Sequence, residues 1–290
     1  MPTRLTSPNG DLIFGSGHPV MLINAQLRVM DQKPEILDQL QAGNLEGMLA
    51  LAHQGVDIGL DMADILINHP SLDEVELLPR IARAVMDSTG CPVALDTRNV
   101  EALEAALDAA KPYKALINSV SAEKEVLEVL LPLAKKYGAA FIAMPMGSAA
   151  TLPMTPEARL AETRVILEAV DGIGIPREDV VLDGICMAAA AGLGSFEVAL
   201  ATLAAVKREM DLTTTLGIGN AGFGMPDRTV IDQAYLLGAV PWGLDSALVE
   251  PNTSGLIESV RAMDFLTGRD EVGKRYIQLY RKKKSEQILK

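Results

Sequence analysis

The hydrophobic residues of this chain fall into short unbroken runs that are separated by longer amphipathic stretches. The runs are rich in Val, Ile, Leu and Ala and do not alternate with polar residues. Parallel strands that are covered on both faces show continuous apolar runs of this kind. We predict strands at residues 20–24, 56–61, 92–96, 115–118, 140–145, 180–183, 214–219 and 242–249.

The stretches between the runs predict helices. Apolar residues recur at helical spacing in residues 99–110, 121–137, 155–172, 195–210 and 227–237. Eight strands that alternate with helices predict an α/β fold, a single (β/α)8 TIM barrel. We expect one domain over residues 1–290, with a core at about 18–267 and a helical tail at 268–290. The first and last dozen residues are expected to be loose additions or a terminal helix.

Composition narrows the class of protein. A chain of 290 residues with 49% apolar residues can bury the core of one barrel, and a net charge of −12 argues against nucleic-acid binding. No apolar run approaches the roughly 20 residues of a membrane span, and the start does not resemble a signal peptide. Cys91 and Cys186 lie far apart, as in a reduced, cytoplasmic protein, and His18, His53 and His69 lack metal-ligand spacing. We therefore expect neither a metal site nor a membrane partner.

Four of the runs end in a carboxylate or a carboxamide, at Asp96, Asn118, Asp183 and Asn220. The carboxyl ends of barrel strands converge on one mouth, where the chemistry takes place. The four side chains are expected to line a hydrogen-bonding cup that suits a flat heterocycle rich in N–H donors. Asp96 is the strongest candidate, because Asn99 is better placed to cap the following helix. Asn118 and Asp183 would also serve as ordinary turn residues.

Two further segments bear on the mouth. Residues 217–224 match Gly-x-Gly-x-x-Gly, but a dinucleotide fold places that fingerprint in its first strand–helix turn, so this reading is disfavoured. A phosphate cradle and a mobile loop that carries Asn220 both remain open. Met144 lies at the end of another predicted strand and Met146 directly after it, and they would either fill the core or support the face of a flat ring.

Five segments together resemble one family. They are Leu-Asp-Thr-Arg-Asn at 95–99, Leu-Ile-Asn-Ser-Val-Ser-Ala-Glu at 116–123, Leu-Asp at 182–183, Leu-Gly-Ile-Gly-Asn at 216–220 and Asp-Arg at 227–228. In this order they resemble motifs of the pterin-binding barrel family, specifically the methyltetrahydrofolate:corrinoid-protein methyltransferases. The resemblance extends from about residue 20 to residue 267.

The resemblance implies roles for individual residues. Asp96, Asn118 and Asp183 would hold the donor edge of a pterin, Met144 would support its ring, and Asn220 would approach N5. Asp96 and Asn220 would thus be the catalytic pair.

The chain departs from the family pattern at two strand ends, and one paired motif differs in its first residue. At the second strand the chain has Asp61-Met-Ala-Asp64 where the family often has Asp-x-Asn, so Asp61 or Asp64 would substitute. Arg228 would match the Arg of the family's Asn-Arg pair. The first strand has Ile-Asn-Ala-Gln at 23–26 in place of Gly-Glu-Arg-x-Asn.

The implied activity is methyl transfer, in either direction, between N5 of tetrahydrofolate or 5-methyltetrahydrofolate and the cobalt of cobalamin on a separate corrinoid protein. The implied assembly is a homodimer with an open mouth. A dihydropteroate synthase is an alternative, although its late Ser-x-Arg and early Asn-x-Thr-x-Asp-Ser-Phe elements are absent. An aldolase or phosphosugar isomerase would need a strand-end Lys or Glu base, and the predicted strand ends offer no Lys. A non-catalytic pterin- or corrinoid-binding subunit also remains open.

Overall fold

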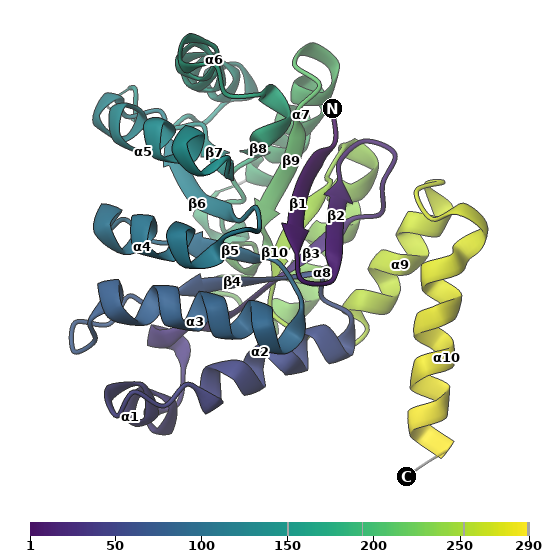
Figure 1. Ribbon diagram of the computed structural model, residues 1–290. Coiled ribbons are helices and arrows are strands. Elements are labelled where there is room, and N and C mark those ends of the chain that lie inside the picture. Colours follow the sequence, from purple (N-terminus) through teal and green to yellow (C-terminus); the bar gives the residue numbers. More distant parts are fainter. Residues whose placement is uncertain (150, 193, 252, 289–290) are drawn as a thin grey trace.

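A closed barrel of parallel strands forms the centre of the molecule (Figure 1). The computed structural model describes residues 1–149, 151–192, 194–251 and 253–288. The strands are β3 (Met21–Arg28), β4 (Met62–Leu66), β5 (Val93–Asp96), β6 (Leu116–Ser121), β7 (Ala140–Met144), β8 (Val180–Asp183), β9 (Thr213–Gly217) and β10 (Ser246–Val249). They follow one another around the barrel, and β10 closes it against β3. The predicted (β/α)8 barrel is confirmed.

Helices cover the outside of the barrel (Figure 1). They are α1 (Pro34–Gln41), α2 (Glu46–Ile58), α3 (Glu74–Thr89), α4 (Val100–Ala110), α5 (Lys124–Tyr137), α6 (Pro156–Ile173), α7 (Ser195–Glu209), α8 (Arg228–Ala239), α9 (Leu256–Leu266) and α10 (Lys274–Ile288). The five predicted helices are confirmed to within a few residues at each end. Asn99 caps α4 by accepting hydrogen bonds from the backbone N–H groups of Glu101 and Ala102, which leaves Asp96 available for another role.

The predicted strand at residues 56–61 is wrong. Val56 to Ile58 belong to α2, which ends at Gly59 in the left-handed conformation (φ 105°), and the strand begins only at Met62. The buried face of α2 consists of Met48, Ala52 and Gly55, so two of its three buried residues are small. A short apolar run cannot by itself distinguish a buried helix end from a strand, and here the helix wins. The predicted strand at 242–249 also starts too early, because residues 240–242 form a 3-10 turn before β10.

The first residues are not loose but form the floor of the barrel. Strands β1 (Thr3–Ser7) and β2 (Gly10–Phe14) make an antiparallel hairpin, with Gly10 at φ 106° in its turn. Leu5 and Phe14 are fully buried in one cluster with residues of the barrel interior. The backbone N–H of Lys114, just before β6, donates to Thr6 Oγ1 at 2.7 Å, which fixes the hairpin to the amino ends of the strands.

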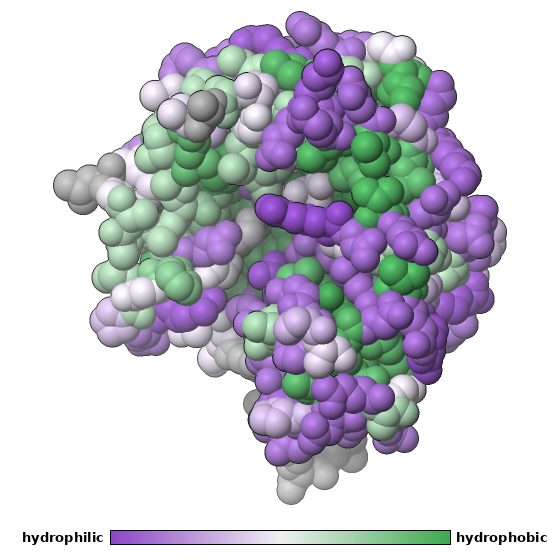
Figure 2. Space-filling view, turned by 90° about the vertical axis from the view of Figure 1, so that its left-hand side faces the viewer, coloured by the Kyte–Doolittle hydropathy of each residue, from purple (hydrophilic) through white to green (hydrophobic). Residues whose placement is uncertain are grey.

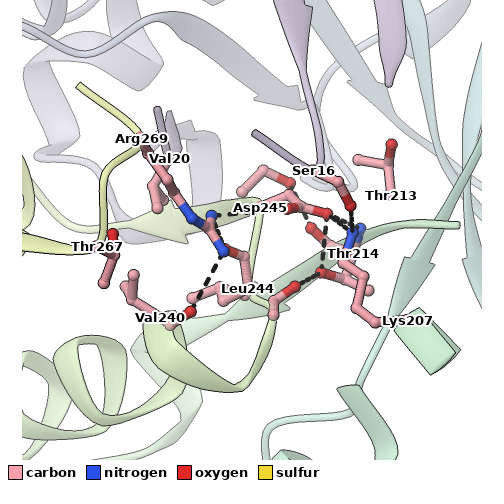
Figure 3. Close-up of polar contacts among 12 residues, drawn as sticks. Ser16, Val20, Lys207, Thr213, Thr214, Val240, Leu244, Asp245, Thr267 and Arg269 are labelled. Carbon is pink, nitrogen blue, oxygen red and sulfur yellow. Dashed lines mark hydrogen bonds and ion pairs between the residues drawn. The ribbon is translucent and has the colours of Figure 1, made fainter. Parts of the chain in front are cut away.

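A buried ionic network secures the same end (Figure 3). Asp245, immediately before β10, is fully buried and accepts hydrogen bonds from Lys207 Nζ and from the backbone N–H of Thr214. Arg269 Nη1 lies 3.6 Å from the other carboxylate oxygen. One carboxylate thus ties α7, β9 and the segment after α9 to the start of β10.

Candidate active site

The alternation of the strands aims the candidate side chains into the barrel. Apolar residues of β4, β5, β6 and β8 belong to the interior cluster, and each is followed two positions later by a polar residue. Side chains two apart on a strand lie on the same face. The apolar residues are Met62, Ala94, Leu116 and Val181, and the polar ones are Asp64, Asp96, Asn118 and Asp183. The carboxyl end of each of these four strands therefore presents a polar side chain above the apolar interior of the barrel.

Asp64, Asp96 and Asn118 come together at the mouth. Asn118 Nδ2 donates a hydrogen bond of 3.0 Å to Asp64 Oδ1. Arg28 Nη2, from the end of β3, lies 3.6 Å from Asp64 Oδ2 and 4.0 Å from Asp96 Oδ2. Asp64 Oδ2 is buried and has no hydrogen-bond partner among the described residues. A buried acceptor of this kind is stabilised by a ligand that brings N–H donors.

Burial and mutual repulsion disfavour the charged forms of these carboxyl groups. Burial raises the pKa of Asp64, while Asn118 and Arg28 oppose the rise. Burial and the nearby charge of Asp64 raise the pKa of Asp96 to about 7, against the opposing charges of Arg28 and Arg98. Two neighbouring carboxylates resist simultaneous ionisation. The charge of the cup consequently changes near neutral pH.

Asp183 at the end of β8 is buried in a tightly held turn. Its Oδ1 accepts a hydrogen bond of 2.7 Å from the backbone N–H of Ile185, and burial raises its pKa to about 6. Arg159 of α6, itself fully buried, donates through Nη1 to the carbonyl oxygens of Gly184 at 2.6 Å and Ile185 at 3.1 Å. The direction of the Asp183 side chain is thus fixed from two elements.

Asn220 lies on a 3-10 turn (Ile218–Asn220) directly after β9 and is exposed. The turn is held from α8: Arg228 Nη2 donates to the Gly219 carbonyl at 2.9 Å, and Asp232 accepts from the Gly222 N–H at 2.7 Å. A Cβ on Gly217 would lie 3.3 Å from Asn220 Nδ2. The glycine therefore leaves room for the amide over the strand end. Because its backbone is held, Asn220 would move through its side chain.

Met144 lines a cavity of about 380 Å³ at the rim. The other lining residues lie at the end of β6, in the loops after β5, β6 and β7, or in the first turns of α4 and α5, and they include Thr97, Arg98, Ser121 and Met146. Figure 2 shows this side of the molecule, where the carboxyl ends of the strands lie, and the surface is hollowed near its middle.

One candidate lies elsewhere. Asp61 precedes β4 and therefore sits at the amino end of the barrel, where it accepts a hydrogen bond from Arg261 at 3.0 Å and one from Arg275 at 2.6 Å. Although burial opposes it, these two guanidinium groups hold the pKa of Asp61 below its usual range. Asp61 was placed at the mouth only because the second strand was shifted, and Asp64 takes that place.

Two residues at the mouth were not predicted from the sequence. Arg28 ends β3, and Glu250 follows β10, where burial raises its pKa. A strand-end search over the predicted ranges could have found Glu250, which comes directly after the run at 242–249. No simple pattern could have found Arg28, because its direction depends on an irregularity of β3.

Comparison with known proteins is consistent with this geometry. Residues 34–250 match the family described as pterin binding enzymes, so the chain belongs to that family. It is 27% identical over 214 residues to a methylcorrinoid:tetrahydrofolate methyltransferase of Eubacterium limosum, covering 73% of this chain and 78% of that one. It is 26% identical over 223 residues to the methionine synthase of Mycobacterium tuberculosis, covering 72% of this chain but 18% of that longer protein.

Solved structures show the same fold. A dihydropteroate synthase of Yersinia pestis with a pterine–sulfa conjugate and one of Coxiella burnetii with pteroic acid each have a TM-score of 0.69 at 17% identity. Each match covers 92% of this chain and 100% of the other. Separately, none of the helices in the described part of the chain is long and apolar enough to cross a membrane.

Proposed function

We propose that this protein transfers a methyl group between N5 of tetrahydrofolate and the cobalt of a corrinoid that a second protein carries. The observation that carries the proposal is the set of acceptors in the cup, above all the buried Asp64 Oδ2, which lies beside Asp96 and Asn118 and has no hydrogen-bond partner among the described residues. The donor edge of a pterin offers N–H groups to such acceptors. The similarity to a methylcorrinoid:tetrahydrofolate methyltransferase supports the corrinoid half of the proposal.

The chain's own residues would bind and orient the folate. Asp96, Asn118 and Asp183 would accept or share hydrogen bonds along the donor edge of the pterin, and Met144 would support the ring. Asn220 would donate a hydrogen bond to N5 as the charge there changes, which is catalysis by a positioned dipole. A reduced corrinoid supplies a strongly nucleophilic metal, so the barrel need not provide a nucleophile. These roles fit the absence of a strand-end lysine at the described strand ends.

The test is direct. The protein is mixed with 5-methyltetrahydrofolate and cob(I)alamin, and methylation of cobalt is followed by absorbance. Formation of methylcobalamin at a rate proportional to enzyme supports the proposal. If the protein binds the folate but transfers its methyl group neither to free cobalamin nor to a corrinoid protein, it is instead a non-catalytic subunit.

The fold that the protein shares with dihydropteroate synthases makes that activity the second candidate. It is tested on the same preparation with dihydropterin pyrophosphate and p-aminobenzoate. Dihydropteroate as the product, with no methyl transfer, would replace the proposal.

A further inference from the structure

Strand β3 contains a bulge that changes which side chain enters the barrel. Asn24 pairs with Ala63 and Leu27 pairs with Ile65, so three steps along β3 match two steps along β4. Before the bulge Met21, Ile23 and Ala25 face the interior. Unbroken alternation would put Leu27 there next, but Leu27 packs with Ile65 in the outer core. The extra residue turns Arg28 inward instead.

Side chains on both sides hold the bulge. Asn24 Oδ1 accepts from the backbone N–H of Gln26 at 3.0 Å, and Asn24 Nδ2 donates to the Leu51 carbonyl of α2 at 3.2 Å. Gln32 Nε2 donates to the carbonyl oxygens of Gln26 at 2.6 Å and Arg28 at 3.0 Å. A built bulge beside a candidate site is a means of aiming one side chain.

Gly55 of α2 is the space that makes this arrangement possible. A Cβ at Gly55 would lie 2.3 Å from Asn24 Nδ2, closer than non-bonded atoms approach, and 3.0 Å from Asn24 Cγ, which is a tight contact. The direction of Arg28 thus depends on a glycine of the first long helix, through Asn24 and the bulge.

Arg28 arrives beside two carboxylates that repel each other. Its Nη2 lies 3.6 Å from Asp64 Oδ2 and 4.0 Å from Asp96 Oδ2, while its Nε is buried without a hydrogen-bond partner among the described residues. The other charged groups that act on Asp96 are Glu74 and Arg98, and Arg28 also interacts electrostatically with Glu250. Arg98 is exposed, so Arg28 is the cation with the least solvent screening.

We propose that Arg28 is a positioning residue that holds the carboxylates of Asp64 and Asp96 ready for the donor edge of a pterin, and so sets the pH range in which folate binds. This inference rests on the proposed function. Removal of the guanidinium leaves the two carboxylates without their shared counter-charge. An opposite charge within about 4–6 Å commonly lowers a carboxyl pKa by about 1–3 pH units, so the loss is measurable.

The experiment compares Arg28→Met, Arg28→Lys and the control Arg98→Met with wild type. In ligand-free protein labelled with ¹³C-aspartate, the Asp96 carboxyl is assigned from Asp96→Asn and titrated by NMR. Arg28→Met is expected to raise the midpoint of the Asp96 titration by about one pH unit or more. Arg28→Lys should bring the midpoint most of the way back to the wild-type value. Arg98→Met should raise the midpoint by less than Arg28→Met does. An Arg28→Met midpoint equal to wild type overturns the inference without reference to any ligand.

Calorimetry with 5-methyltetrahydrofolate over the same pH range completes the test. Wild-type affinity is expected to fall roughly tenfold per pH unit below the Asp96 midpoint, and the Arg28→Met profile to be displaced upward with the NMR midpoint. A displaced midpoint with an unchanged binding profile overturns the folate half of the inference. Failure of wild type to bind the folate at any pH refutes the proposed function, and with it that half, while the NMR result still decides the role of Arg28.

Gly55→Ala supplies an independent variant that leaves Arg28 in place. The added methyl group displaces Asn24, so the bulge shifts and the Asp96 titration should move in the same direction as in Arg28→Met. A Gly55→Ala protein that is folded by circular dichroism and has the wild-type titration would show that the bulge does not direct Arg28.

Discussion

The exchange Asp96→Asn should stabilise the ligand-free protein above neutral pH while it weakens folate binding. Burial and the charge of Asp64 raise the pKa of Asp96 from its ordinary 3.8 to about 7. Between these two values the folded state binds a proton that the unfolded chain has lost. The contribution of Asp96 to stability therefore declines as pH rises through that window, and the ionised group is disfavoured above it. Asparagine has nearly the same shape and carries no charge.

The magnitude follows from the same shift. A rise from 3.8 to about 7 corresponds to at most about 4 kcal/mol, at about 1.36 kcal/mol for each pH unit. The Asp96 side chain is 27% exposed, and water screens part of the effect, so we expect a gain of about 1–2 kcal/mol. Loss of a charge-assisted hydrogen bond to the pterin should weaken folate binding by about 1.5–3 kcal/mol, which is roughly 10- to 150-fold.

The assay is denaturant unfolding of wild type and Asp96→Asn at about pH 5 and about pH 8.5, where Asp96 is neutral and ionised respectively. The stability difference should be much larger at the higher pH, because at about pH 5 only the lower part of the window between 3.8 and about 7 has been crossed. An equal gain at both pH values, or a less stable variant at the higher one, would refute the electrostatic reasoning. Calorimetry on the same proteins measures the folate affinity, and Asp96→Ala should show the same loss. Unchanged affinity in both variants would remove Asp96 from the pterin site.

Three further outcomes are expected. Asn220→Ala should reduce single-turnover methyl transfer by about 10- to 1,000-fold with little change in folate affinity, because the bond to N5 strengthens in the transition state; a normal rate in a stably folded variant would contradict this. Asp245→Ala should lower the free energy of unfolding by about 3–5 kcal/mol, because Lys207 and Arg269 lose a buried counter-ion. The exposed Asp211, paired with the chain's amino group, is its matched control and should cost under about 1 kcal/mol on replacement by Ala. Light scattering should find a homodimer, and a purely monomeric protein at working concentration would count against that expectation.

The sequence was sufficient for the barrel because its inner and outer strand faces are both apolar. Leu95 packs against the helices and Ala94 faces the interior, so β5 appears as one continuous run. The same property concealed the second strand, where the apolar residues at 56–60 belong to a helix end and an inter-element link. The hairpin at the amino terminus was not predicted because five-residue strands around Gly10 bury mainly Leu5 and Phe14. The hydrophobic pattern of such short strands cannot be recognised without knowledge of the barrel that the hairpin covers.

Some residues of the candidate site could likewise be predicted from the sequence, and others could not. Asp96, Asn118 and Asp183 were predictable because each closes an apolar run, and a strand end in a barrel has one destination. Arg28 was not, because a single extra residue in β3 reverses inside and outside for everything that follows it. The direction of the Arg28 side chain depends on the contact between Gly55 of α2 and Asn24 of β3. Nothing in the sequence pattern marks these two residues as part of the mouth.

The hairpin floor also constrains the order of events. With Leu5 and Phe14 sealing the amino end, the carboxyl mouth is the route by which a small molecule reaches the cup. A macromolecular methyl carrier bound over that mouth would block the same access route. Folate would then have to enter before the carrier docks and could leave only after it departs. Steady-state kinetics should accordingly be sequential and ordered, with the folate product competing against the folate substrate for the uncovered enzyme.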